Sequence, residues 1–466
     1  MNPDDLGRTL KLEMDDGRAE SEEDARRIVA TYRLGIRIGR GFEANRTATA
    51  AALTAINTAV RAFPGGVDVE AQADAVISHG WGGERPLHAI VESMGARNVV
   101  QLRDDLGHVI SIGESSRTAR PGQPRTLFAT WEGWGGGVVL DRSDCGSEDA
   151  DQPLAGVLAG ALGVSEAFQA TRGFGPAARR DVGVSLWRPD LPWRDPAARG
   201  PAIEILPAKI WLLGLGHLGQ AHAWSIGSLP YPPGALLIGL LDPQVVVAAN
   251  VDTGLLTALK DIGRPKARVV AAALERRGVA TIVTERLFDG DFRPQRPEPS
   301  TAFAGFDSPE PRRILEGAGF SRVVDAGLGG GAQHYLDILI HSFPSELRAV
   351  TAFPERTRTD PASLLDRPAY AAAIDRLLAG GMTHADARCG VLEVAGRTVG
   401  AAFVGAVAST FVVAEELRAL IDGPRFEVIS VSLRSPEYLD AVVNPAPGPW
   451  VNPGFVRAFV SGARGK

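Results

Sequence analysis

Lys209-Ile-Trp-Leu-Leu213 runs directly into Gly214-Leu-Gly216-His-Leu-Gly219, and helical sequence follows. A short apolar strand, a GxGxxG loop and a helix, in that order, are typical of a phosphate-binding turn. The first glycine permits a tight turn, the second lets a phosphate approach the backbone, and the third lets helix and strand pack closely. The start of the helix then offers N–H donors to an anion. The sequence therefore predicts that Gly214, Gly216 and Gly219 bind a nucleotide.

A carboxylate follows the next apolar segment. The strand predicted over Ala235–Leu241 ends at Asp242, which lies 26 residues after Gly216 (242 − 216). This is close to the spacing at which an acidic residue binds a ribose hydroxyl in a βαβ nucleotide site. The alternative is a solvated turn aspartate before Pro243. These features alone fit a nicotinamide dinucleotide as well as ATP.

The second half of the chain alternates predicted strands and helices, which predicts an α/β fold with a mostly parallel sheet and helices on both faces. The expected segments are Lys209–Leu213, Leu218–Leu229, Ala235–Leu241, Lys266–Arg277, Thr281–Glu285 and Arg322–Asp325. Arg293–Pro311 is rich in proline and is expected to be a loop.

Further polar positions follow in a distinctive order. Asn250 comes eight residues after Asp242, Lys260-Asp-Ile-Gly-Arg-Pro-Lys266 opens an Ala-rich helix, and an apolar strand ends at Asp325. Cys389-Gly-Val-Leu then precedes a Gly/Ala-rich helix. In these positions the chain resembles the ThiF/MoeB/ubiquitin-activating (E1-like) family over about 230 residues, from about 201 to 435.

The resemblance implies Mg²⁺- and ATP-dependent adenylation of a carboxylate, the C-terminal carboxylate of a ubiquitin-like protein. It implies that Asp242 holds the ribose, Lys266 contacts the phosphates, Asn250 assists there, and Asp325 organises Mg²⁺. Charge that develops on phosphate oxygens is stabilised by a lysine, and a carboxylate is a suitable Mg²⁺ ligand. It also implies that Cys389 lies on a mobile crossover loop and attacks the acyl-adenylate or forms a sulfur intermediate. The alternative for Cys389 is a small packing residue.

Two positions depart from the family pattern. The family usually has Asn-x-x-Arg, whereas this chain has Asn250-Val-Asp-Thr253, and Gln244 replaces a second acidic residue. Arg264 and, from the N-terminal half, Arg46 are the candidates to take the place of the missing arginine. If neither acts, the chain is a scaffold that binds a peptide or protein tail without chemistry. A third interpretation is a nicotinamide-dependent dehydrogenase.

The chain is predicted to have five segments: a mobile acidic tail (1–20), an N-terminal α/β domain (21–190), a Pro-rich linker (191–207), the E1-like domain (208–435) and a C-terminal extension (436–466). The helix predicted over Pro153–Thr171 is similar, as far as Phe168, to that over Val399–Leu417, but no GxGxxG precedes it. The N-terminal domain thus resembles the inactive half of a two-part E1, so that two Rossmann-like halves form a pseudo-dimer. The alternative is an unrelated α/β domain.

The composition and charge of the chain exclude several other classes of protein. The net charge is −6, so nothing favours a nucleic-acid partner. Two cysteines, Cys145 and Cys389, are too few for a disulfide scaffold or a four-cysteine zinc site. The N-terminus lacks the pattern of a signal peptide, and the most apolar run, Val399–Ala414, is short for a membrane span. We expect a cytoplasmic protein. The resemblance further suggests a role in antiphage defence, with an E2-like protein and a second copy of the chain as additional partners.

Overall fold

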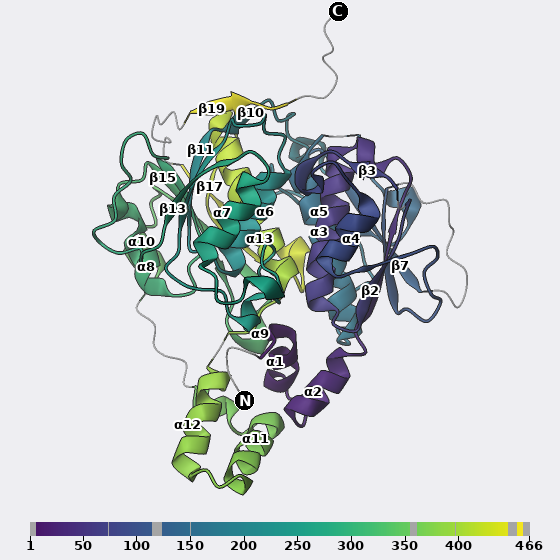
Figure 1. Cartoon of the computed structure of the whole chain (residues 1–466). Helices are drawn as coiled ribbons and strands as arrows, with labels where there is room; N and C mark the ends of the chain where they lie inside the picture. Colours follow the sequence, from purple (N-terminus) through teal and green to yellow (C-terminus); the bar gives the residue numbers. More distant parts are fainter. Residues whose placement is uncertain are drawn as a thin grey trace, which may run out of the picture.

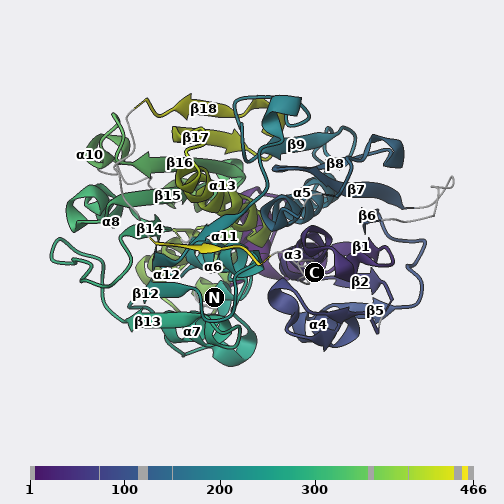
Figure 2. The same cartoon turned by 90° about the horizontal axis from the view of Figure 1, so that it is seen from above.

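The computed structural model describes residues 6–72, 74–113, 124–149, 151–354, 361–396, 398–445 and 454–459. Two α/β halves lie side by side, and a small lobe lies beneath them (Figure 1). The lobe is formed by α1 (Arg8–Asp15), α2 (Glu22–Val29), α11 (Pro368–Ala379) and α12 (His384–Ala395). Seen from above, the two sheets flank a central layer of helices (Figure 2).

The N-terminal half is built on a sheet that has, among the described residues, the strand order β5-β2-β1-β6-β7-β8-β9. The strands from β5 to β7 are parallel, while β8 and β9 are antiparallel additions. Its elements are β1 (Arg33–Ile38), α3 (Arg46–Ala62), β2 (Gly66–Glu70), α4 (Leu87–Met94), β5 (Arg97–Val99), β6 (His108–Ile112), β7 (Arg125–Glu132), β8 (Gly135–Val139), α5 (Pro153–Thr171) and β9 (Val182–Ser185), with a small β3 (Val76–Ile77) and β4 (Arg85–Pro86) ribbon.

The C-terminal half repeats this plan in the order β13-β12-β11-β14-β15-β16-β17-β18. The strands from β13 to β15 are parallel, as predicted, and β16 to β18 are antiparallel, which the sequence pattern did not indicate. Its elements are β11 (Lys209–Leu213), α6 (His217–Ser228), β12 (Leu237–Leu241), α7 (Lys266–Glu275), β13 (Ala280–Thr284), β14 (Thr301–Ala304), α8 (Pro309–Arg313), β15 (Arg322–Leu328), α9 (Gly331–His334), β16 (Asp337–Phe343), α10 (Ala349–Ala352), α13 (Ala402–Leu420), β17 (Phe426–Ser432) and β18 (Asp440–Val443).

The strands of the first sheet match those of the second in order, and β18 is an additional edge strand of the second sheet. β1, β2, β5, β6 and β7 occupy the places of β11, β12, β13, β14 and β15, and α3 and α5 occupy those of α6 and α13. The predicted pair of Rossmann-like halves is confirmed, and the alternative of an unrelated N-terminal domain is wrong.

Helices α3, α5, α6 and α13 join the halves in one continuous apolar core. The Phe168 and Phe403 rings lie 5.4 Å apart, and the Trp81 and Trp224 rings stack at 4.9 Å. Of the described helices, α5 alone is long and apolar enough to cross a membrane, but 89% of that stretch is buried inside the protein. Its apolar character is therefore accounted for by its place between the two sheets.

The predicted mobile tail over residues 1–20 is wrong for its described part, which begins at Leu6. Residues Arg8–Asp15 form helix α1, which is almost entirely buried. It packs with α2 (Glu22–Val29), α11 (Pro368–Ala379) and α12 (His384–Ala395) around a second apolar core that includes Leu10, Met14 and Tyr370. Lys11 and Asp15 are also buried, but they form an ion pair of 2.6 Å, which offsets the cost of burying either charge alone. The acidic composition of residues 1–20 therefore gave no indication that helix α1 has a buried apolar face.

Two predicted boundaries also need correction. The Pro-rich segment 191–207 is packed on the protein: its last residues form β10 (Ile205–Pro207), which pairs with β19 (Phe455–Arg457) from the predicted C-terminal extension. That extension was placed from residue 436, yet β18 at Asp440–Val443 belongs to the second sheet. The second half therefore extends beyond residue 435.

Candidate nucleotide site

The phosphate loop lies between β11 and α6, as predicted. Gly214 has φ +79°, which favours glycine, and a Cβ on Gly219 would lie 1.9 Å from the Gly214 carbonyl oxygen. Gly216 is the N-cap of α6, and within the described residues no side chain caps this helix. The N–H groups of its first turn are therefore available to an anion.

The matching helix of the N-terminal half, α3, has its first turn occupied by protein groups. The Asn45 side chain accepts a hydrogen bond from the Ala48 N–H (2.9 Å). Arg46 is ion-paired to Asp151 at 2.7 Å, and the Thr47 hydroxyl accepts from the Gln152 N–H at 2.8 Å. An anion would have to displace these contacts, so the nucleotide-binding features belong to the second half.

Asp242 closes β12 and organises the loop. Its Oδ2 accepts a hydrogen bond from the Leu215 N–H, and its Oδ1 accepts one from the Gln244 N–H, both at 2.7 Å. A carboxylate has about four acceptor positions, so it retains capacity for a ribose hydroxyl. Asp242 is 5% exposed, and the alternative of a solvated turn residue is wrong.

Lys266 begins α7 and lies beside this turn. Its Nζ donates to the Gln244 Oε1 at 2.7 Å, so Gln244, which replaces the family's second acidic residue, directly positions the lysine. Burial lowers the pKa of the Lys266 ammonium, while the carboxylates of Asp242 and Asp307 oppose this lowering and the charge of Arg8 adds to it. The charges of Asp242, Asp307 and Arg8 therefore all act on the Lys266 ammonium at this edge of the sheet.

Asp325 does not lie in that group. Strand order is the reason: β14 is the neighbour of β11, and β15, which carries Asp325, is one strand further away. Asp325 is fully buried, and its oxygens accept hydrogen bonds of 3.1 and 3.0 Å from the Arg312 Nε. The Arg312 guanidinium in turn lies 4.1 Å from the centre of the Phe353 ring. Burial raises the pKa of Asp325 to about 6, and Arg312 limits that rise.

Asp307 is the carboxylate that the sequence interpretation missed. It follows β14, and its neighbour Phe306 is close enough to the phosphate loop that a Cβ added to Gly214 would lie 3.1 Å from its ring. The available signal was the short apolar strand Thr301–Ala304, which was hidden because Arg293–Pro311 was interpreted as a loop. That interpretation is wrong for these four residues and for residues 309–311, which begin helix α8.

Arg8 was also missed. It is the first residue of α1, and its N–H donates to the Asp252 Oδ2 at 2.7 Å while its guanidinium donates to the Thr398 carbonyl. Burial lowers the pKa of His217 to about 4, and the charge of Arg8 contributes to this as it does at Lys266. Arg8 is therefore bonded to Asp252, the residue before Thr253, where the family's missing arginine would stand.

The two arginines suggested by the sequence do not reach the loop. Arg46 lines a small cavity with Ser228, at the opposite end of α6 from Gly216. Arg264 is half exposed and is ion-paired to Asp261 at 2.5 Å. Neither replaces the missing arginine in this arrangement.

Asn250 supports the loop around the missing arginine. Its Oδ1 accepts from the Val247 N–H at 2.9 Å, which stabilises the turn before Asp252. Gln220 of α6 connects the same region to the phosphate loop, because its Nε2 donates to the Leu215 carbonyl (3.2 Å) and its Oε1 accepts from the Leu256 N–H (2.9 Å). In this structure the Asn250 side chain therefore holds the backbone of the turn at Val247 in place.

Cys389 lies on α12 in the segment that crosses from β16 to α13, and its side chain is exposed. The alternative of a buried packing residue is therefore wrong. The thiol belongs to the four-helix lobe and is not among the groups that surround Lys266. It stays a predicted nucleophile that would have to reach the nucleotide site by movement of the lobe or of the acylated partner.

The donor set fits ATP and Mg²⁺. The uncapped N–H groups of α6 can donate hydrogen bonds to phosphate oxygens, and the Asp242 carboxylate can accept one from a ribose hydroxyl. Magnesium is usually bound by one or two carboxylates together with nucleotide phosphates and water. Asp307 is exposed beside Lys266 and fits this role, whereas Asp325 does not fit because Arg312 occupies its oxygens. No cluster of three or more metal-binding side chains occurs among the described residues.

Two sheets of one plan, with a nucleotide loop in the second, define an E1-like protein. Sequence profiles of the BilD N-terminal and C-terminal domains match residues 33–186 and 206–423. The chain is 34% identical to the bacterial E1-like protein BilD of Collimonas sp. (strain OK412) over 474 residues, which cover 98% of this chain and 97% of that protein. The chain belongs to the BilD family of bacterial E1-like proteins.

Two solved structures are similar in part. Escherichia coli MccB with MccA-N7isoASN matches 51% of this chain and 64% of its own, at 13% identity and a TM-score of 0.33. E. coli TcdA, a tRNA N6-threonylcarbamoyladenosine dehydratase in complex with AMP, matches 46% of this chain and 86% of its own, at 16% identity and a TM-score of 0.27.

Proposed function

We propose that this protein uses Mg²⁺ and ATP to adenylate the C-terminal carboxylate of a ubiquitin-like protein, with release of pyrophosphate. The observation that carries the proposal is the uncapped phosphate loop bonded to Asp242, with Lys266 held beside the same turn by Gln244. The charges of Asp307 and Arg8 act on the Lys266 ammonium. Membership of the E1-like family supports adenylation as the reaction class.

In this reaction a carboxylate oxygen of the substrate attacks the α-phosphorus of ATP. The bond between the α-phosphorus and the bridging oxygen breaks, and pyrophosphate leaves with that electron pair. Lys266 and Arg8 would stabilise the negative charge that develops on the phosphate oxygens. Asp242 would hold the ribose and keep the loop in shape through the Leu215 N–H. Magnesium, held by Asp307 and the phosphates, supplies further charge neutralisation when bound.

The catalytically inactive scaffold was suggested by the arginine missing at Thr253. Arg8 weakens the support for that alternative, because it offers an arginine beside Asp252 from another part of the chain, with a charge that acts on Lys266. A dehydrogenase is not supported by any further feature of the site, and the family assignment favours the E1-like interpretation.

We propose a second step at the exposed thiol of Cys389 as well. Transfer of the adenylated carboxylate to Cys389 would yield a thioester and AMP, and an E2-like protein would accept the acyl group from it. A cytoplasmic location, a role in antiphage defence and association with a second copy of the chain extend the resemblance to the E1-like family.

The test is ATP–pyrophosphate exchange with candidate ubiquitin-like proteins. We expect exchange with a free C-terminal carboxylate and none after C-terminal amidation. Lys266→Ala and Arg8→Ala should each reduce exchange by roughly 100-fold to 1000-fold, as for loss of one electrostatic donor, with smaller effects on ATP affinity. Arg286→Ala, which removes an exposed arginine paired with Asp289, is the control. ATP binding without exchange for every partner would support the scaffold instead.

A further inference from the structure

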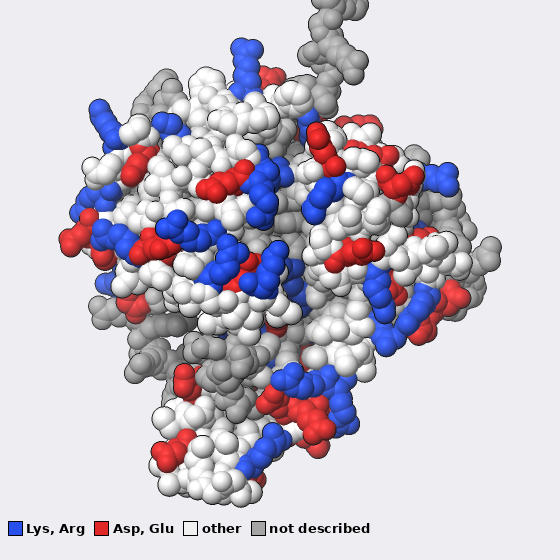
Figure 3. All heavy atoms as spheres, in the orientation of Figure 1, with Lys and Arg blue, Asp and Glu red and all other residues white. Residues whose placement is uncertain are grey.

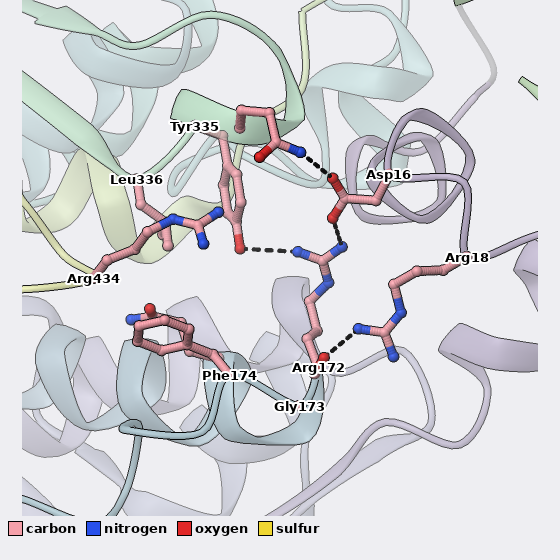
Figure 4. Close-up of a pocket in the computed structure, with 10 residues that line it drawn as sticks. Asp16, Arg18, Arg172, Gly173, Phe174, Tyr335, Leu336 and Arg434 are labelled. Atoms are coloured by element: carbon pink, nitrogen blue, oxygen red, sulfur yellow. Dashed lines mark hydrogen bonds and ion pairs between the residues drawn. The ribbon is translucent and has the colours of Figure 1, made fainter.

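A cavity of about 330 Å³ lies where the two halves and α1 meet. It is lined by the end of α5 and the residues after it (Gln169, Arg172, Phe174), by Tyr335 and Arg434 of the second half, and by Asp16 and Arg18 after α1. Figure 4 shows the arginine side chains converging on this space from different elements. The cavity is separate from the phosphate loop, but it lies at the same edge of the second sheet, where β15 ends and β16 begins.

Two of the three guanidinium groups are already neutralised. The Arg172 Nε lies 2.8 Å from Glu13, and its other nitrogens contact Asp16 and donate to the Tyr335 hydroxyl at 3.2 Å. Arg18 lies 3.2 Å from Glu13 and donates to the Arg172 carbonyl. These contacts fix the wall of the cavity, and they leave its positive excess on Arg434.

Arg434 and Gln169 supply the unused hydrogen-bonding groups. The Arg434 guanidinium lies 5.7 Å from the centre of the Phe174 ring, and its Nε is buried with no hydrogen-bond partner. Gln169 is 2% exposed; its Nε2 donates to the Leu433 carbonyl at 2.9 Å, but its Oε1 has no partner. A buried polar atom without a partner costs free energy, so the cavity is suited to a ligand with both an anionic acceptor and an N–H donor. An acidic residue in a peptide has both.

Helix α1 gives the distance from this cavity to the nucleotide site. Arg8 at its start bonds to Asp252, next to the position of the missing arginine at Thr253, and Asp16 just beyond its end lines the cavity. Eight residues of helix rise about 12 Å at 1.5 Å per residue. An extended peptide covers that distance with about four residues, or up to six if it is not fully extended.

We propose that this cavity binds an acidic side chain in the C-terminal tail of the protein substrate, about four to six residues before the carboxylate that is adenylated. The proposal rests on the proposed function, and it adds a requirement on the partner's sequence. On the face drawn in Figure 3, acidic and basic side chains are mixed. The cavity, in contrast, offers the half-buried Arg434 guanidinium, 5.7 Å from the centre of the Phe174 ring and with an unpartnered Nε, which suits selection of a carboxylate.

The binding test uses fluorescein-labelled decapeptides of Gly, Ser and Ala with a free C-terminal carboxylate and one Glu, moved from the third to the ninth position from that end. Anisotropy without ATP isolates the cavity from the chemistry. We expect the tightest binding with Glu at the fourth to sixth residue before the terminal one, and a Kd roughly 10-fold to 100-fold higher for the matching Gln peptide. Equal binding of the Glu and Gln peptides, or an optimum elsewhere, would overturn the proposal.

Two variants separate recognition from folding. Arg434→Gln should remove the preference for Glu, and Arg434→Glu should shift it to a peptide with Lys at the same position, which a purely structural effect would not produce. Arg286→Ala should leave the preference unchanged. A preference for Glu that persists in Arg434→Glu contradicts the assignment.

Exchange assays keep this proposal distinct from the proposed function. With a ubiquitin-like partner that has such an acidic residue, Arg434→Gln should raise KM roughly 10-fold or more and leave kcat nearly unchanged, because the residue binds substrate away from the reacting atoms. Position-dependent peptide binding with no exchange in the wild type would refute adenylation but not the cavity. Exchange with an unchanged KM in Arg434→Gln would refute the cavity but not adenylation.

Discussion

Asp242→Asn tests the nucleotide site most directly, because this carboxylate bonds to the phosphate loop and is expected to bind the ribose. Its two oxygens each accept one backbone N–H at 2.7 Å, from Leu215 and from Gln244. Asparagine keeps one acceptor oxygen and places an NH₂ group where the other was. One backbone N–H therefore loses its acceptor in either rotamer.

The magnitude follows from that single loss. A hydrogen bond to a charged group contributes about 1.5–3 kcal/mol, and the full loss applies at Leu215, which is buried, whereas Gln244 is exposed to water. We expect the free energy of unfolding without ATP to fall by this amount. If the lost partner is the Leu215 N–H, the loop is no longer held in its binding shape, and ATP affinity should fall by about 10-fold to 150-fold.

Calorimetry gives the ATP affinity, and urea denaturation with and without ATP gives the stability. In the wild type, ATP at 100 times its Kd should add about 2.7 kcal/mol to the free energy of unfolding. The control is Asp68→Asn on β2, the N-terminal counterpart of β12. Asp68 is 2% exposed and accepts from the Arg97 Nε at 2.8 Å, so its loss should affect stability and not ATP binding. ATP affinity within twofold of the wild type in Asp242→Asn would refute the assignment.

Three further predictions concern other parts of the chain. Arg312→Met leaves the buried Asp325 unpaired and should lower the free energy of unfolding by about 3–5 kcal/mol, and adding Asp325→Leu should recover much of it; equal urea midpoints for the single and double variants would contradict this. Burial raises the pKa of Glu166 to about 7 from 4.5, so the folded state holds this proton more tightly than the unfolded state, and stability should decline as pH rises between these values. Glu166→Gln should flatten that decline, by up to a few kcal/mol in denaturation series at pH 5 and pH 8, and an unchanged slope would contradict the cause given. Cys389→Ser should abolish a thiol-sensitive adduct with the ubiquitin-like partner on a gel, and persistence of the adduct would assign the exposed thiol no part in transfer.

Local signals in the sequence were sufficient for the central elements. The strand Lys209–Leu213 has the predicted bounds, and the helix predicted at Pro153 extends to Thr171 as expected. Both are apolar segments bounded by glycine or proline, so residues close in sequence are sufficient to predict where each begins and ends. The loop glycines and Asp242 belong to the same short segment, and the structure brings them together for that reason.

The remaining site residues depend on contacts between distant segments. Asp307 and Asp325 both follow apolar strands, and nothing in either segment shows which strand lies beside β11. Arg8 lies in a segment whose acidic composition resembled a mobile tail, and its role appears only after α1 packs against both halves. The sequence indicated that an arginine was missing, but it could not indicate where a substitute would come from.

The position of α1 also affects how the protein matures on the ribosome. Asp15 of α1 bonds to Tyr370, 355 positions later, and Arg8 bonds to Thr398, 390 positions later. At translation rates of about 5–20 residues per second, the second of these contacts must wait about 20–80 s after Arg8 is made. A chain that has not yet reached α11 can therefore fold its N-terminal sheet while α1 still lacks the partners that fix Arg8 and Asp15. The surroundings of Asp252 would be completed only after those later segments have been made.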